Sequence, residues 1–324
     1  MHVGDAGRRI MTEQPGTQRA DARWQARGER GHAWLMRLMA FLSLRLGRRL
    51  TRPLLLPISL YFLCFVPEAR RSSRAFFERV RGRRAGLGEA FWHIHHFAST
   101  IHDRVYLLND RVNAFDVEVE GREHFEPPEP AILVGAHIGS FDALRAAGWS
   151  ERQLPITMMM YPENARNIQR VLDAINPQRA ADIIELGRID SMIEADRRLH
   201  RGHLVGMLAD RSLASDPMTE RDFLGHPATF AEGPFRMAAL LRQRVLFMAG
   251  IYLGGNRYRV LFEPIADFRG VTRSDRRRAI AEAMDHYVER LEILVREHPD
   301  NWFNFFDFWA KGSPRDSHSD RENS

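Results

Sequence analysis

The sequence predicts an α/β fold, with a mostly parallel or mixed central sheet flanked by helices. Strand-like segments rich in apolar and β-branched residues alternate along most of the chain with amphipathic helical stretches, which is typical of an open sheet covered by helices. The chain has 324 residues, of which 44% are hydrophobic, so it can bury a large core. Disulfides are not needed for stability, and the single cysteine, Cys64, has no partner.

The predicted elements follow one another in the order that such a fold requires. Strands are expected at residues 115–120, as an edge strand, and at 131–136, 156–161, 182–186 and 203–208. Helices are expected at residues 139–147, 163–175, 189–201 and 275–297. Residues 245–253 and 258–262 predict a β-hairpin, because Gly254-Gly255-Asn256 between them is typical of a tight turn.

Composition divides the chain into four parts. Residues 1–33 are polar and rich in glycine and arginine, which predicts a disordered tail, and residues 311–324 predict a second polar tail. Residues 34–84 are apolar and basic. Residues 85–310 are expected to form the α/β domain.

Residues 34–84 carry twelve arginines and two glutamates around two apolar stretches. The longer stretch, from Pro53 to Pro67, has no charge but is shorter than the ~20 apolar residues that a membrane-spanning helix needs. The pattern favours helices that lie in a membrane interface, with arginines near anionic headgroups. A short or tilted span and a buried helical hairpin that caps the domain are the alternatives. The mean hydropathy of −0.38 excludes a polytopic membrane protein.

Several classes of site are excluded by what the sequence lacks. One cysteine excludes a cysteine-rich zinc site or an iron–sulfur cluster, and no Walker A, Gly-x-Gly-x-x-Gly or Gly-x-Ser-x-Gly motif occurs. His93, His95 and His96 resemble metal ligands, but the apolar stripe of the same helix places His93 and His96 on other faces. We therefore predict no metal site and no bound cofactor.

A predicted strand, turn and helix hold the best candidates for catalysis. The strand ends at His137, Gly139 provides the turn, Ser140 can cap the helix and Asp142 lies in its first turn. A carboxylate that accepts the proton on one imidazole nitrogen leaves the other nitrogen free as a general base. The spacing therefore predicts His137 as the base and Asp142 as the acid that orients it.

Three further segments are candidates for substrate contacts. Asp210-Arg211 ends a predicted strand, the place where open α/β sheets bind ligands. Glu232-Gly233-Pro234-Phe235-Arg236 opens a helix whose free N–H groups suit an anionic or polar group, and Gly187-Arg188 opens another helix. Each of these segments is also compatible with an ordinary element boundary.

Together these blocks resemble the lysophospholipid acyltransferase superfamily. Their order, the basic apolar leader and the aromatic segment Asn301 to Trp309 are similar to the lipid A late (lauroyl/myristoyl) acyltransferase branch, over roughly residues 34–310. Ser140-Phe141-Asp142 stands where those enzymes usually carry Asn-Trp-Glu, and Asp210-Arg211 where they usually carry Asp-Gln. These departures leave the acceptor open, so lipid A or another envelope lipid is compatible with the sequence.

The resemblance implies an acyltransferase at the cytoplasmic face of the bacterial inner membrane. His137 would deprotonate an acceptor hydroxyl, which attacks the thioester of an acyl-acyl carrier protein or acyl-CoA used as co-substrate. Candidates for phosphate or oxyanion contacts are Arg145, Arg188, Arg211 and Arg236. The expected partners are acyl carrier protein, a lipid acceptor and the membrane surface, without nucleic acid.

Two other functions are the alternatives. An esterase with the same His and Asp would need a serine elbow, which the sequence lacks. A non-catalytic lipid-binding module would need only the leader. The run Met158-Met159-Met160 predicts a core strand first, and the wall of an acyl pocket second.

Overall fold

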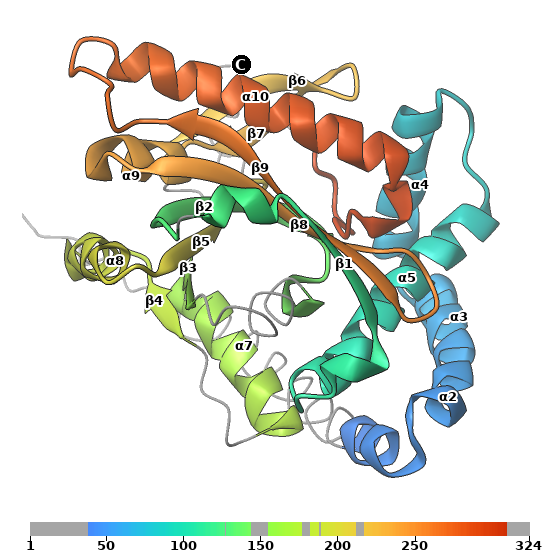
Figure 1. Ribbon diagram of the computed structural model, residues 1–324. Helices are drawn as coiled ribbons and strands as arrows, with labels where there is room; N and C mark the ends of the chain where they lie inside the picture. The colour runs from blue at the N-terminus through green and yellow to red at the C-terminus, as the bar shows by residue number, and fades with distance from the viewer. Residues whose placement is uncertain are drawn as a thin grey trace, which may run out of the picture.

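The computed structural model describes residues 38–126, 128–143, 155–176, 182–187, 189–211 and 217–309. Within these residues, seven strands form one sheet in the order β1-β9-β8-β2-β5-β3-β4 (Figure 1). Their bounds are β1 Asp116–Glu120, β2 Ala131–Gly139, β3 Ile156–Met160, β4 Ile183–Glu185, β5 Leu204–Leu208, β8 Arg244–Tyr252 and β9 Arg257–Asp267. Every neighbouring pair is parallel except β8 with β9. The predicted mostly parallel or mixed sheet and its terminal hairpin are confirmed.

Helices cover both faces of the sheet (Figure 1). α9 (Gly233–Leu241) and α10 (Arg276–Glu297) lie on one side, and α5 (Leu87–Leu107) and α7 (Pro162–Ile175) lie on the other. α8 (Ile189–His200) packs with the first group. The helices expected near α7, α8 and α10 are confirmed. Of the helix expected at 139–147, Gly139 ends β2, Ser140 precedes the helix, residues 141–143 are helical and residues 144–147 lie outside the described residues.

The central strand β2 shows why its sequence is apolar throughout. Ile132 and Val134 point into the larger core, which contains α9 and α10, whereas Ala131 and Leu133 point into the smaller core on the opposite face. All four side chains are fully buried. Because side chains alternate between the two faces of a strand, a strand covered on both sides reads as a continuous apolar run.

A second, two-stranded sheet was not predicted. β6 (Met218–Phe223) and β7 (His226–Ala231) form an antiparallel hairpin whose β6 strand contacts α10. β6 contains Glu220, Arg221 and Asp222, residues that strands disfavour, so its apolar content is too low to predict a strand.

The described part of the apolar leader is largely helical, and two consecutive helices in it have different surroundings. α4 (Pro67–Arg81) buries Phe76 and Phe77 in the larger core. α3 (Leu55–Phe65) packs Leu63 against α5 but leaves many apolar side chains exposed. The exposed large hydrophobic residues on α3 are Leu56, Leu60, Tyr61, Phe62 and Phe65. The predicted tails at 1–33 and 311–324 lie outside the described residues.

No single helix in the described part of the chain is long and apolar enough to cross a membrane alone. The helices Arg48–Phe65 and Pro67–Arg81 satisfy the length and composition of a span only together, and they are bent by 93° at the break between them.

A buried ion pair connects the leader to the sheet. Arg48, in the short helix α2 (Arg48–Thr51), donates from Nε and Nη2 to the two oxygens of Asp103 on α5, at 2.7 and 2.9 Å. The hydroxyl of Tyr258 on β9 donates to the same carboxylate at 2.9 Å. Burial would raise the pKa of Asp103, but the adjacent His102 side chain, the hydrogen bonds from Arg48 and the charges of Arg48 and Arg52 outweigh it, so the pKa is lowered. Removing either partner would leave a buried charge uncompensated.

Gly139, the last residue of β2, has a backbone that only glycine accommodates. Its φ is +66°, and a Cβ placed there would lie 2.0 Å from the carbonyl oxygen of Gly250 on β8. We expect Gly139→Ala to lower the free energy of unfolding by about 3 kcal/mol or more, because left-handed strain adds to a backbone overlap. Urea denaturation followed by tryptophan fluorescence measures this change.

Gly225→Ala is the matched control. Gly225 has a φ of +77°, but a Cβ placed there would have no neighbouring atom within 4 Å, so only the strain of about 1 kcal/mol is expected. Equal losses for the two variants would contradict the importance of the close approach between β2 and β8.

Candidate active site

The imidazole of His137 is held at the carboxyl end of β2 by a carboxylate from the neighbouring strand. β2 and β5 are parallel neighbours, so their ends meet at the same edge of the sheet. Asp210 follows β5 by two residues, and its Oδ1 lies 2.9 Å from Nδ1 of His137. The Asp210 side chain is completely buried, whereas the His137 side chain is 33% exposed. The imidazole therefore has one buried, paired edge and one accessible edge.

Two more hydrogen bonds fix the Asp210 carboxylate. Its Oδ2 accepts from the backbone N–H of His137 at 2.9 Å and from Nδ2 of Asn304 at 3.0 Å. Burial would raise the pKa of Asp210, but the charge of His137, its hydrogen bonds and the charge of Arg211 outweigh this effect and hold the pKa at about 2. Asp210 is therefore ionised near neutral pH, and it accepts the proton that Nδ1 of His137 carries.

With Nδ1 engaged, Nε2 is the imidazole nitrogen available for chemistry. No other residue in the described ranges forms a hydrogen bond with Nε2. His137 also lines a cavity of about 690 Å³, so this nitrogen has access to a bound molecule. An orienting carboxylate behind an accessible imidazole is the arrangement of a general base.

The turn after His137 has the predicted form. Gly139 turns the chain, the N–H of Ser140 donates to the carbonyl of Gly250 at 2.7 Å, and Oγ of Ser140 accepts from the N–H of Ala143 at 3.2 Å. Ser140 therefore caps the start of a helix, as the sequence indicates. Both Gly139 and Ser140 line the cavity.

The partner of Asp142 differs from the predicted one. Asp142 lies in the first helical turn after Ser140 and lines the cavity, but its Oδ2 accepts from Nε of Arg104 at 2.5 Å. Nδ1 of His137 is already occupied by Asp210, and α5 places a guanidinium within reach of Asp142. The orienting acid in this structure is therefore Asp210, whereas the sequence predicted Asp142. A catalytic role for Asp142 stays a prediction.

The walls of the cavity are mainly apolar. They come from α5, from the ends of the central strands, from α7 and from Phe303, Phe305 and Phe306. Met158 and Met160 on β3 belong to the lining, whereas Met159 points into the larger core on the opposite face. The expected strand is confirmed, with one face in the core and one in the cavity, and the methionines as the wall of an acyl pocket stay a prediction.

The other predicted contact residues are not all brought together. Arg211 lines the cavity and donates to Oδ1 of Asn304 at 2.6 Å and to the carbonyl of Phe303 at 2.8 Å. Partial burial lowers the pKa of Arg211, and the charge of Asp210 acts in the opposite direction. Arg145 and Arg188 lie outside the described residues.

The segment that opens α9 is separate from the cavity lining. Glu232 forms an ion pair with Arg236 at 2.9 Å, and Gly233 is the first residue of α9. In the described part of the chain, Glu232, Gly233 and Arg236 do not line the cavity of His137. The residue before them is linked to the site, since the N–H of Ala231 donates to the carbonyl of Ala209, next to Asp210.

Two groups of residues at the site were not predicted from the sequence. Arg104, Phe97 and Thr100 come from α5, and Phe303 and Asn304 come from the segment after α10. The segment Asn301 to Trp309 contributed only to the family resemblance, because only the packing of distant segments brings these residues to the site.

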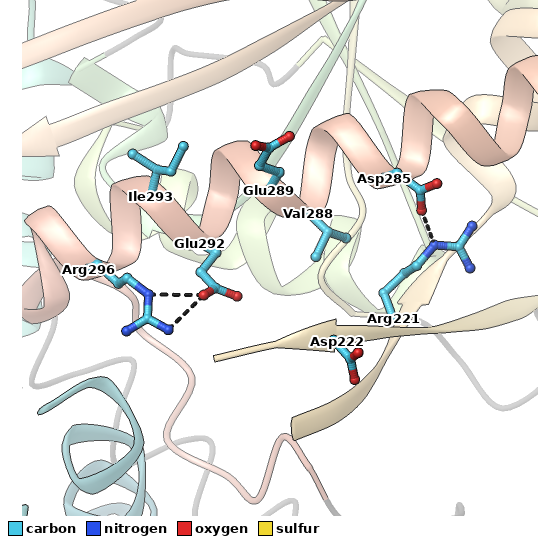
Figure 2. A pocket seen from close by; sticks show the side chains of 8 residues that line it. All are labelled: Arg221, Asp222, Asp285, Val288, Glu289, Glu292, Ile293 and Arg296. Carbon is cyan, nitrogen blue, oxygen red and sulfur yellow. Dashed lines mark hydrogen bonds and ion pairs between the residues drawn. The ribbon is translucent and has the colours of Figure 1, made fainter. Parts of the chain in front are cut away.

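A second cavity lies between the β6–β7 hairpin and α10 and carries paired charges (Figure 2). Arg221 binds Asp285, and Arg296 binds Glu292, which also accepts from the N–H of Leu224. The Arg221–Asp285 pair and the Leu224–Glu292 hydrogen bond attach the hairpin to the helix, whereas Arg296 pairs with Glu292 within α10. These contacts explain the charges without a ligand.

The histidines of α5 do not form a metal site in the described residues, where no cluster of three potential ligands occurs. His93 is buried and hydrogen-bonds Oγ of Ser73 at 2.9 Å and the carbonyl of Trp302 at 3.0 Å. Burial lowers the pKa of His93 to about 3, against a smaller raising effect of the Trp302 carbonyl, so this ring is neutral. Its function is structural.

Comparison with known proteins identifies the family. Residues 94–311 match the family described as bacterial lipid A biosynthesis acyltransferase. The chain belongs to this family. It is therefore an acyltransferase, which moves an acyl group from a donor to a lipid acceptor. His137, Asp142, Asp210 and Asn304 all lie within the matched residues.

Two further comparisons complete this result. The chain is 19% identical to the 1-acyl-sn-glycerophosphate (LPA) acyltransferase PlsC from Thermotoga maritima, with a TM-score of 0.36, over 75% of this chain and 98% of that chain. No curated protein sequence matches.

The two carboxylates near His137 are distinguished by isosteric substitution. We expect Asp210→Asn to lower kcat by roughly 10²–10⁴-fold, because an amide in that place does not hold the same tautomer or stabilise the charged ring. We expect Asp142→Asn to lower kcat by about tenfold or less, because Asp142 binds Arg104 in the structure. Steady-state acyl transfer by the purified variants is the measurement, with thermal unfolding as a control. A larger loss for Asp142→Asn would assign the orienting role to Asp142.

Proposed function

We propose that this acyltransferase is a membrane-associated O-acyltransferase that uses His137 as its general base. The observation that supports the proposal is the imidazole itself: Nδ1 is 2.9 Å from the buried Asp210, and the ring lines a largely apolar cavity. The acceptor is a hydroxyl of a lipid A-like or other envelope lipid. The donor is an acyl thioester on an acyl carrier protein or CoA.

In the proposed reaction, Nε2 of His137 takes the proton of the acceptor hydroxyl as its oxygen attacks the thioester carbonyl. The new C–O bond forms, the C–S bond breaks, and the leaving thiolate recovers the proton from the imidazolium. Asp210 stabilises the imidazolium while it carries this proton. Because a thiolate leaves readily, one base is sufficient and no covalent acyl-enzyme is needed.

The positive groups at the cavity have separate proposed roles. Within the described residues, Arg211 donates to two neutral acceptors, Asn304 and Phe303, so its charge is available to an oxyanion or a phosphate. Arg104 is bound to Asp142, and this pair forms a polar edge of the cavity. We assign the headgroup or thioester end of the substrates to this polar edge.

The apolar part of the cavity is the proposed acyl site. A volume of about 690 Å³ is suited to a fatty chain, and its walls include Met158, Met160 and Met248. Methionine side chains are flexible and apolar and adapt to an alkyl chain. Gly206 on β5 makes room for this wall, since a Cβ there would lie 2.6 Å from the sulfur of Met158.

The exposed apolar side chains of α3 support attachment to the membrane. Leu60, Tyr61 and Phe65 are exposed on this helix, and its Leu63 packs with Ile94 of α5 and Phe305, which lines the cavity. Insertion of α3 into the headgroup region would thus place the acyl cavity beside the lipid acceptor. We propose the cytoplasmic face of the inner membrane as the location.

The arginines of the leader are the proposed contacts for the acidic surfaces nearby. Arg45, Arg49, Arg71 and Arg84 are exposed, whereas Arg48 and Arg52 are engaged with Asp103. Exposed guanidinium groups suit both anionic headgroups and an acidic acyl carrier protein.

Mass spectrometry of envelope lipids from cells with and without the protein tests the proposed function. We expect one acylated lipid to be lost in cells without it and restored by the wild-type chain but not by His137→Ala. His200→Ala, at an exposed surface histidine, is the control and should restore the lipid fully. Purified protein given matched acyl-acyl carrier protein or acyl-CoA then identifies the donor. Release of free fatty acid without an acceptor would support an esterase, and full restoration by His137→Ala would support a lipid-binding module.

Adjacent methionines provide a test of the acyl site. We expect Met158→Ala to lengthen the acyl chain that is transferred, because truncation enlarges the cavity. Met159→Ala removes the same volume from the core on the opposite face, so it should lower stability by about 2–5 kcal/mol without changing chain length. Competition among acyl thioesters of different lengths, read by mass spectrometry of the product, is the measurement. Identical chain preferences in the two variants would exclude Met158 as a wall of the acyl site.

A further inference from the structure

We infer that Asn304 is a positioning residue, which acts on His137 through Asp210. The inference rests on the proposed function, in which His137 is the base, and adds a residue from a segment outside the sheet. We call residues 299–306 the strap, since they follow α10 and pass over the end of β2.

The strap is attached directly to β2, the strand that carries His137. Trp302 forms a β-bridge with Ile138, and the N–H of Phe303 donates to the carbonyl of His137 at 2.8 Å. The Trp302 side chain is fully buried, and its carbonyl lies 3.0 Å from Nε2 of His93 on α5. The backbone that follows the His137 side chain is therefore tied to the backbone that carries Asn304.

Asn304 is buried and uses both ends of its amide. Its exposed fraction is 2%. Nδ2 donates to Oδ2 of Asp210 at 3.0 Å, and Oδ1 accepts from Nε of Arg211 at 2.6 Å. The amide thus lies between a carboxylate and a guanidinium and separates two opposite charges that are adjacent in the sequence.

This separation has a chemical consequence. Without Asn304, Arg211 could rotate to pair directly with Asp210 and compete with His137 for its oxygens. With Asn304 in place, Oδ1 of Asp210 faces His137, while Oδ2 is held by an N–H from His137 and an N–H from Asn304. A carboxylate held in this way fixes the ring orientation and the tautomer of the base.

Two other sets of titratable groups among the described residues lie near this cluster. Tyr287 on α10 donates its hydroxyl to the carbonyl of Gly135, and burial, with the charge of Asp210, raises its pKa well above the usual value. Arg104 and Asp142 line the cavity as an ion pair. Tyr287 is neutral and the ion pair has no net charge, so Asp210, Arg211 and the residue at 304 determine how readily the ring holds a proton.

Asn304→Asp is the sharpest test. It keeps the size of the side chain and the acceptor for Arg211, but replaces the N–H donor by an oxygen that repels Asp210. The added negative charge favours a protonated ring, and the charge of Arg211 offsets only part of it. We expect the acid limb of the kcat/KM profile to move up by about one pH unit, and kcat near pH 7 to fall by about tenfold or more with KM changed less than about twofold.

The strap supplies a matched control in Asn301. Its side chain is 3% exposed, and it accepts from the N–H of Tyr252 at 2.8 Å and donates to the carbonyl of Tyr252 at 3.1 Å. Asn301→Asp makes the same chemical change three residues earlier, away from Asp210. We expect it to lower the melting temperature without moving the acid limb.

A second measurement does not depend on acyl transfer. The titration of the His137 ring can be followed by NMR of histidine-labelled protein and assigned with His137→Gln. We expect its midpoint to move to higher pH in Asn304→Asp and to stay in place in Asn301→Asp. Asn304→Ala should broaden or shift the same resonance, which covers the case in which Asn304→Asp folds poorly.

The outcomes are distinguishable. An unchanged acid limb and ring titration in Asn304→Asp, or equal shifts in Asn301→Asp, would overturn the positioning role while leaving the acyltransferase proposal intact. Absence of O-acyl transfer by wild-type protein together with the expected NMR shifts would overturn the proposed function but retain the link from Asn304 through Asp210 to His137.

Discussion

The carboxylate of Asp210 is the constraint on which the site depends. It is buried, and its two oxygens accept hydrogen bonds from two groups of His137 and one of Asn304. A buried charge with fewer donors would cost several kcal/mol, so the strands and the segment that provide these donors must meet in one arrangement. The parallel pairing of β2 with β5 supplies two of the donors, and the chain after α10 supplies the third.

A second buried carboxylate has a corresponding function in the attachment of the leader. Asp103 binds Arg48 of α2 and Tyr258 of β9, so the part of the leader just before α3 is fixed to the sheet by an ion pair and a hydrogen bond. α5 takes part in both systems, since it carries Asp103 toward the leader and Arg104 toward the cavity. One helix therefore contacts both the leader, whose α3 exposes apolar side chains, and the cavity beside His137.

Much of the fold was predictable because its signals are local. The apolar run of β2, the turn at Gly139 and the cap at Ser140 lie within a few residues of one another, and each agrees with the structure. His137 and Asp210 were both recognised as strand-end residues. Their pairing was not predicted, because it joins positions 73 residues apart, and an acid five residues away was the nearer choice. Asn304 and Arg104 reach the site across 94 and 38 residues, and the strands β6 and β7 are too polar to recognise.

The position of the strap in the chain has a consequence for biosynthesis. A ribosome completes every strand of the sheet before it adds Asn301 and Asn304. At ordinary translation rates of about 5–20 residues per second, the nascent protein carries His137 and Asp210 for roughly 5–20 s before the last donor to that carboxylate emerges. During this interval Asp210, which orients the imidazole, lacks the hydrogen bond from Asn304. The set of hydrogen bonds to Asp210 is therefore complete only after the final segment has docked.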